Sequence, residues 1–274
     1  MAKLLVPTDF SPGSAAAARY GFALAGDLRC ELELMHAYHA DSAGGSLIDV
    51  EEHMEAGVHQ DYEEFYEGLR ADVPSGLAVH RRTERRRPDA AVERVLKLEG
   101  DEVIALVMGA RGETAAERVF AGSTTQKVID EVAHPVFAVP QDFVGATVGP
   151  RRILWAVDGD TDPGRRGLDL VRTLAMRAGG ALTFYYGGGA GELPEGRLHH
   201  LAGPAEYTSI TERDADDASA GIIAAAERIG ADLIAVTHGK GGFFSRVFGR
   251  STTGQTLRHS RVPVLVLPRA DKDA

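Results

Sequence analysis

The chain has 274 residues, a length that suits two domains of about 100 to 150 residues each. Its 30 Lys and Arg residues against 40 Asp and Glu residues give a formal net charge of -10, which argues against a general binder of nucleic acids or anionic membranes. The single cysteine, Cys30, excludes an intrachain disulfide and a cysteine-rich metal cluster, and it fits a cytoplasmic protein. The apolar residues 4–6 are too few for a signal peptide or a membrane span.

An internal repeat starts with the first predicted element. Residues 4–9 read as an apolar strand that ends in an acid, and residues 153–158 repeat the pattern. A helix is expected after each strand. Ser11 can cap the first helix and Pro12 suits its first position, while the second helix is expected from about Asp162.

The two copies differ most in their middle. Counted from the acid of the first strand to the proline before the last, the second copy is 21 residues shorter than the first. The first copy has an amphipathic stretch at residues 50–70 that predicts a helix. At the same point the second copy has Gly-rich and Pro-bounded stretches, residues 187–191 and 194–204, which we expect to be loop.

The ends of the two copies match. Ser123 precedes Pro135 by twelve residues, and Ser251 precedes Pro263 by the same number. Each proline opens a predicted apolar strand, and pairing these two last strands would hide their unpaired backbone groups. The last strands are predicted at residues 136–139 and 264–267.

Strands and helices therefore alternate within each copy, which predicts an α/β fold with a parallel sheet covered by helices on both faces. The remaining strands are predicted at residues 31–38, 77–83 and 104–108, and at residues 181–186, 205–211 and 233–236. Ligands of such open sheets bind beyond the carboxyl ends of the first and fourth strands, so Asp9 and Gly109 should lie close together. Residues 142–150 read as a linker between domains at residues 1–144 and 151–270.

A glycine-rich motif follows the fourth strand of the first copy. Two residues separate Gly109 from Gly112, and nine residues separate Gly112 from Gly122, which Ser123 follows directly. Glycines let a backbone approach a ligand closely, and a helix that starts at Ser123 would offer free N–H groups and a positive dipole end to a phosphate. Asp9 could accept hydrogen bonds from a ribose or an adenine edge. In combination these features predict a nucleoside-phosphate site, although each alone is equally typical of a turn or a helix cap.

Other signals are weaker. The neighbouring histidines at positions 36 and 39, and at 199 and 200, have no second set of ligands nearby, so no zinc site is expected. The arginine-rich residues 81–87 are interrupted by acids and read as a solvated strand end and loop. Walker A, G-x-G-x-x-G and G-x-S-x-G motifs are absent from the sequence. Binding of a nucleotide is therefore supported, but turnover is not.

The first copy resembles the ATP-binding members of the universal stress protein family, and the whole chain resembles a tandem-domain member. The residues that carry the resemblance are 6–11, 34–37, 107–112, 122–124 and 135–140. It implies two Rossmann-like modules, each with five parallel strands in the order 3-2-1-4-5, that pair through their last strands. The implied ligand is ATP, with ADP or AMP as alternatives, together with Mg.

The resemblance also implies roles for single residues. Those at the ends of the first, second and fourth strands would hold or flank adenine and ribose: Pro7, Thr8, Asp9, Ala37 and Met108. Those of the glycine-rich motif would hold the phosphates: Gly109, Arg111, Gly112, Gly122, Ser123 and Thr124.

The second copy departs from the motif. Thr237, Lys240 and Arg250 stand where the first copy has Gly109, Gly112 and Gly122. A second site would need a loop of shifted register, and its candidate residues are Asp158, Gly239, Gly242, Ser251 and Thr252.

These expectations describe an ATP-binding stress-response protein in which the nucleotide acts as a regulatory ligand of the first domain. Two alternatives stay open: a slow ATP hydrolase or a protein that phosphorylates itself on Ser123 or Thr124, and a nucleotide-independent scaffold that binds partners through residues 41–70. A homodimer and an unidentified protein partner fit either reading.

Overall fold

The computed structural model describes residues 1–39, 47–110, 123–144, 148–158, 162–177, 181–187, 193–212, 217–238 and 252–270. Its first module follows the predicted alternation of strands and helices. The elements are β1 (Lys3–Thr8), α1 (Pro12–Leu28), β2 (Glu31–Ala37), α2 (Leu47–Leu69), a 3-10 turn (Arg70–Asp72), β3 (Val79–Glu84), α3 (Pro88–Glu99), β4 (Val103–Gly109), α4 (Ser123–Glu131) and β5 (Val136–Val139).

The second module repeats the first with a shorter middle. Its elements are β6 (Arg152–Ala156), α5 (Arg165–Arg177), β7 (Ala181–Gly187), α6 (Glu195–Ala202), β8 (Tyr207–Glu212), α7 (Ala218–Ile229), β9 (Leu233–His238), α9 (Thr252–His259) and β10 (Val264–Pro268). The expectation of a loop at residues 194–204 is wrong, because α6 forms there. Leu198, Leu201 and Ala202 are buried in the module's core, and this burial stabilises a helix too short to be obvious from its own sequence.

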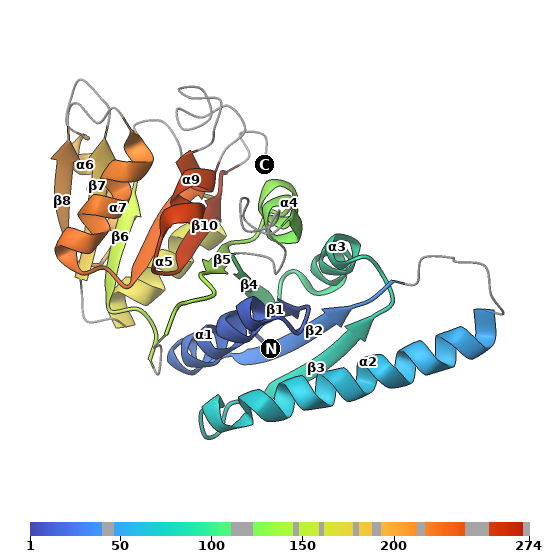
Figure 1. Cartoon of the computed structure of the whole chain (residues 1–274). Helices are drawn as coiled ribbons and strands as arrows, with labels where there is room; N and C mark the ends of the chain where they lie inside the picture. Colours follow the sequence, from blue (N-terminus) through green and yellow to red (C-terminus); the bar gives the residue numbers. More distant parts are fainter. Residues whose placement is uncertain are drawn as a thin grey trace.

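The ten strands form one sheet in the order β3-β2-β1-β4-β5-β10-β9-β6-β7-β8 (Figure 1). Each module thus has the order 3-2-1-4-5, and all neighbouring strands within a module are parallel. The predicted fold class is confirmed.

The two modules join at β5 and β10, which run antiparallel. Leu265 lies opposite Phe137, and Val266 lies opposite Val136. All four side chains are at most 2% exposed. Near this seam Arg166 of α5 donates a hydrogen bond of 2.8 Å to the backbone oxygen of Val103 in the first module. The edge groups of the last strands are therefore satisfied within the chain.

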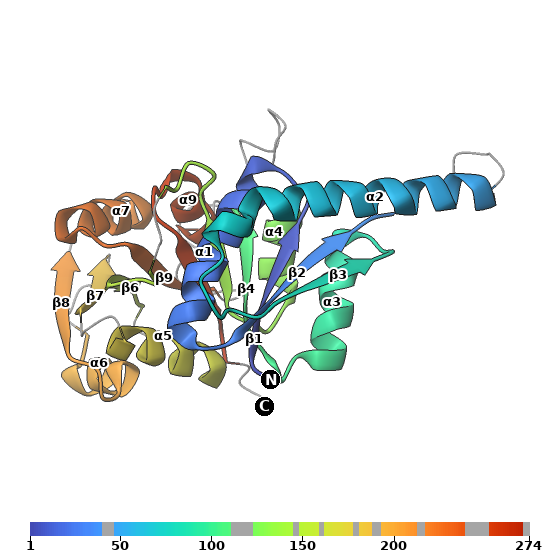
Figure 2. The same ribbon diagram turned by 90° about the horizontal axis from the view of Figure 1, so that it is seen from below.

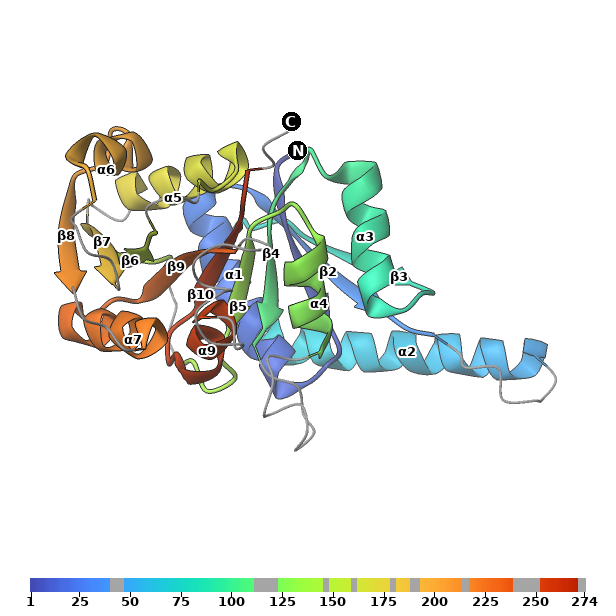
Figure 3. The ribbon, with the colours of Figure 1, turned by 90° about the horizontal axis from the view of Figure 1, so that it is seen from above.

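Helices cover both faces of the sheet, as Figure 3 shows from above. α1, α2, α5 and α6 pack on one face, around strand residues such as Val6, Phe137 and Trp155. α3, α4, α7 and α9 pack on the other, around Leu106 and Val264. Side chains alternate between the two cores along each strand, and both cores extend across the seam.

A buried ion network lies in the first module. Nζ of Lys3 is 2.7 Å from Oε2 of Glu33, and Nε of Arg82 is 2.6 Å from Oε1 of the same carboxylate. Glu99 at the end of α3 pairs with both cations. Burial opposes the charge of Lys3, but its bonds to Glu33 and Glu99 outweigh burial and raise its pKa. Arg82 is thus part of the interior network, contrary to the expectation that residues 81–87 are solvated.

We predict that Glu33→Gln lowers the free energy of unfolding by about 2 to 3 kcal/mol, because it removes one of the two carboxylates that balance the charges of Lys3 and Arg82. Urea unfolding of the purified protein measures the loss. Glu102→Gln is the matched control, since Glu102 is 55% exposed and pairs with the exposed N-terminal amine; its change should stay within about 0.5 kcal/mol. Equal effects of the two substitutions would contradict the assignment.

Candidate functional site

The candidate site lies where the winding of the first module reverses. β1 pairs with β2 on one side and with β4 on the other, so the carboxyl ends of β1 and β4 are adjacent. Asp9 directly follows β1, and Gly109 ends β4. Open α/β sheets bind ligands in the crevice at this reversal.

The turn between β1 and α1 is held by its own side chains. Asp9 accepts a hydrogen bond of 3.1 Å from the backbone N–H of Ser11, and Thr8 accepts one of 3.1 Å from that of Phe10. Ser11 caps α1 by accepting from the backbone N–H of Ser14 at 3.2 Å. Thr8 and Ser11 are buried, whereas Asp9 is exposed. The carboxylate is therefore the polar side chain that this turn presents to solvent.

The neighbouring candidates lie at the same edge with different exposure. Met108 is only 4% exposed and packs in the core beneath α3 and α4. Pro7 and Ala37 are half-buried. Met108 could flank a ligand only through the part of its side chain that this core leaves accessible.

Gly109 is required by packing within the protein. A Cβ at this position would lie 3.0 Å from both the carbonyl carbon and the oxygen of Gly13 in the first turn of α1. The hydroxyl of Thr125 donates a hydrogen bond of 2.8 Å to the backbone oxygen of Gly109 and so ties α4 to the end of β4. The sequence reasoning attributed Gly109 to close approach of a ligand and missed Gly13, whose contact only the folded chain reveals.

The amino ends of α1 and α4 lie at this edge. Neither helix has an acidic residue in its first turn, so their dipoles are not opposed there. Thr124 is half-buried in the first turn of α4. Arg111, Gly112 and Gly122 lie outside the described residues, as does the side chain of Ser123.

His36 and Phe10 complete the surroundings of the turn. Nδ1 of His36 donates a hydrogen bond of 2.8 Å to the backbone oxygen of Thr8. The ring of Phe10 stacks on the imidazole at 4.1 Å between centroids. Burial lowers the pKa of His36, which favours the neutral ring. The sequence carried no signal for the stacking.

The second module's crevice differs from the first at two positions. The strand pairings align Thr237 with Gly109, so a side chain stands where the first module needs a glycine. Asp158 is 7% exposed, whereas Asp9 is exposed.

The chain before α5 also bonds to the end of β10. The N–H of Gly164 donates to the oxygen of Pro268 at 2.9 Å, and that of Ala270 donates to the oxygen of Asp162 at 3.0 Å. β9 lies between β6 and β10 in the sheet, so these bonds join residues that follow β6 to a strand that is not its neighbour. Thr252 begins α9, while Gly239, Gly242 and Ser251 lie outside the described residues.

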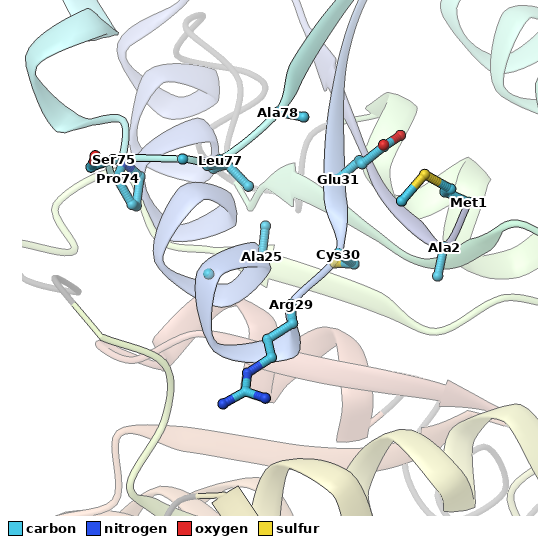
Figure 4. A pocket seen from close by; sticks show the side chains of 12 residues that line it. Met1, Ala2, Ala25, Arg29, Cys30, Glu31, Pro74, Ser75, Leu77 and Ala78 are labelled. Carbon is cyan, nitrogen blue, oxygen red and sulfur yellow. The ribbon is translucent and has the colours of Figure 1, made fainter.

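A cavity of about 530 Å³ lies at the opposite end of the strands (Figure 4). It is lined by residues before β1, β2 and β3, among them Ala2, Cys30 and Leu77. Burial raises the pKa of the Cys30 thiol to about 11. Because these residues precede the strands and Asp9 and Gly109 lie at the carboxyl ends, the cavity is separate from the candidate site.

Comparisons with known proteins agree on the family. A sequence model described as the universal stress protein family matches residues 1–140 and 188–268. A search of curated protein sequences finds no match. No helix in the described ranges combines the length and apolarity that a membrane crossing needs.

Two solved structures share the fold over nearly the whole chain, and a third matches about half of the chain. A universal stress protein from Archaeoglobus fulgidus DSM 4304 is 20% identical with a TM-score of 0.74, over 99% of this chain and 97% of that one. A putative universal stress protein from Pseudomonas aeruginosa UCBPP-PA14 is 16% identical with a TM-score of 0.59, over 97% and 93%. A universal stress protein in complex with cAMP is 22% identical with a TM-score of 0.39, over 53% and 97%.

We predict that Gly109→Ala destabilises the protein by about 1 to 3 kcal/mol, because the new Cβ would press on the backbone of Gly13. Urea unfolding measures this loss. Gly68→Ala is the matched control: Gly68 lies in α2, a Cβ there meets nothing within 4 Å, and the helix should gain about 0.5 to 1 kcal/mol. A neutral Gly109→Ala would show that α1 can withdraw from β4 at no cost.

Proposed function

The chain belongs to the universal stress protein family, and from this premise we propose that its first module binds one adenine nucleotide, ATP, at the carboxyl ends of β1 and β4. The observation that carries the proposal is that an exposed carboxylate, Asp9, follows β1 while Thr125 ties the amino end of α4 to Gly109 at the end of the paired strand β4. A carboxylate accepts hydrogen bonds from the nucleoside end of a nucleotide, whereas the amino end of a helix favours the negative charge of the phosphate end.

Asp9 suits the nucleoside end. Its carboxylate is already oriented by the N–H of Ser11, and an ionised acceptor forms strong hydrogen bonds to ribose hydroxyls or an adenine amino group. The half-buried Pro7 and Ala37 would flank the base, with Met108 beneath them. Thr8 would act through the shape of the turn, because its hydroxyl already contacts Ser14 and the N–H of Phe10.

The amino end of α4 suits the phosphate end. Ser123 and Thr124 open this nine-residue helix, and its first N–H groups and dipole favour negative charge. The other residues that we propose to hold the phosphates are Gly109, Arg111, Gly112 and Gly122. Magnesium would enter with the phosphate chain and neutralise part of its charge.

We propose one nucleotide per chain. In the second module, Asp158 is buried, Thr237 replaces the glycine at the strand end, and the chain near Gly164 bonds to the end of β10. This module would instead act as a permanent partner of the first, with domains at residues 1–144 and 151–270. A regulatory ligand that biases docking of a protein partner in the cytoplasm is the role we assign to the nucleotide.

We expect calorimetric titration of nucleotide-stripped protein with Mg-ATP to give a stoichiometry near one. Asp9→Asn keeps an acceptor for the N–H of Ser11 but removes the charge, and should weaken binding by roughly ten- to a hundredfold, the scale of one charged hydrogen bond. Gly122→Val should abolish binding. Asp158→Asn is the matched control and should bind as the wild type does.

The same titration ranks ADP and AMP against ATP and tests the alternatives. Two sites per chain would contradict the assignment of the second module. No binding by the wild type would leave partner binding without a nucleotide as the function. Phosphate release that Gly122→Val abolishes would instead identify a slow ATP hydrolase.

A further inference from the structure

Phe10 holds an unusual backbone conformation beside the proposed nucleotide. Its φ angle is +65°, in the left-handed region that residues with a Cβ rarely adopt. Among the described residues, Arg29 is the other non-glycine with a positive φ, and it ends helix α1, where such angles are common. Phe10 instead stands between Asp9 and Ser11, so other interactions must compensate for the cost of this backbone conformation.

The compensation comes from its ring. Besides stacking on His36, the ring of Phe10 lies 5.5 Å from that of Tyr62 and 5.3 Å from that of Phe65, measured between centroids. Tyr62 is 4% exposed and donates a hydrogen bond of 2.6 Å to the backbone oxygen of Leu34, which fixes α2 on β2. One residue therefore links the turn of Asp9 to α2.

α2 is the element that most distinguishes the first module. Its carboxyl end packs on the sheet through Tyr62 and Leu69, while its amino end reaches past the sheet, as Figure 2 shows from below. In the second module the shorter α6 follows β7, and glycine follows Asp158 where Phe10 follows Asp9. The aromatic link thus occurs in the module that also has the complete nucleotide motif.

We propose that Phe10 couples nucleotide occupancy of the first module to the helix α2. The inference rests on the proposed nucleotide binding. Contacts between Asp9 and the nucleotide favour the turn in which Phe10 keeps its left-handed backbone, and in that turn the ring packs on α2. When the turn relaxes, Asp9 loses its orientation, and α2 at the same time loses its contacts with the ring of Phe10. Nucleotide therefore stabilises α2, and by linkage the packing of α2 strengthens nucleotide binding.

Reciprocity makes the coupling measurable at both ends. Hydrogen exchange of residues 58–69 in the full-length protein, followed by mass spectrometry, should slow several-fold on addition of Mg-ATP. Phe65→Leu removes a ring of the link but keeps an apolar side chain, and should weaken Mg-ATP binding by roughly three- to tenfold, the scale of one aromatic pair. The effect of Mg-ATP on exchange should shrink in the same variant.

Tyr66→Leu is the matched control. Tyr66 is the next residue of the same helix and equally half-buried, but its ring contacts Arg81, 5.1 Å away, on β3. This variant should bind Mg-ATP as the wild type does and keep the slowed exchange. Phe10→Gly relieves the backbone and removes the ring, so it should abolish the slowing while the helix content by circular dichroism stays unchanged.

Two outcomes would overturn the proposal, and they are distinct. If the wild type binds Mg-ATP but exchange in α2 does not change, or Phe65→Leu and Tyr66→Leu bind alike, the coupling is wrong and the proposed function stands. If the wild type binds no adenine nucleotide, both are wrong.

Discussion

The antiparallel pairing of β5 with β10 is the constraint on which the rest of the molecule depends. Each strand is short and wholly apolar. Without its partner it would expose an apolar sheet edge with unpaired backbone groups. Pairing them turns two five-stranded sheets into one and makes both cores continuous from module to module. The relative position of the two crevices follows from this seam, as does the contact of Arg166 with the first module.

Within this symmetric frame, the two crevices diverge by small local changes. The close approach of β4 to α1 requires a glycine at position 109, where a Cβ would press on the backbone of Gly13. In the second module Thr237 takes the position of Gly109, and α5 begins at Arg165, further along the chain from its strand than α1 is from β1. The chain that this delay leaves between β6 and α5 bonds to the residues after β10. One lost glycine and one longer connection thus change the end of the sheet at which we propose a site in the first module, while the sheet itself stays intact.

The sequence predicted what depends on periodicity and left out what depends on packing. Strands, their parallel arrangement and the position of Asp9 beside Gly109 follow from apolar runs and turn residues, and the structure has them. The helix α6 could not be predicted, because burial of Leu198 and Leu201 stabilises it rather than its own propensity. The ion network around Glu33 also depends on packing. Arg82 reads as a surface residue in the sequence, and only the alignment of β3 with β2 brings it to Glu33. The roles of the candidate site residues stay predictions.

The turn after β1 divides its residues between structure and binding. The hydroxyls of Thr8 and Ser11 accept hydrogen bonds from the backbone of the turn and of α1. The ring of Phe10 compensates for a strained backbone by packing on α2. Asp9 alone among these neighbours keeps an exposed polar group. A ligand bound here as we propose would derive little affinity from the number of side chains it contacts. Its affinity would depend on how firmly the turn is held, so any element that holds the turn would also influence the ligand.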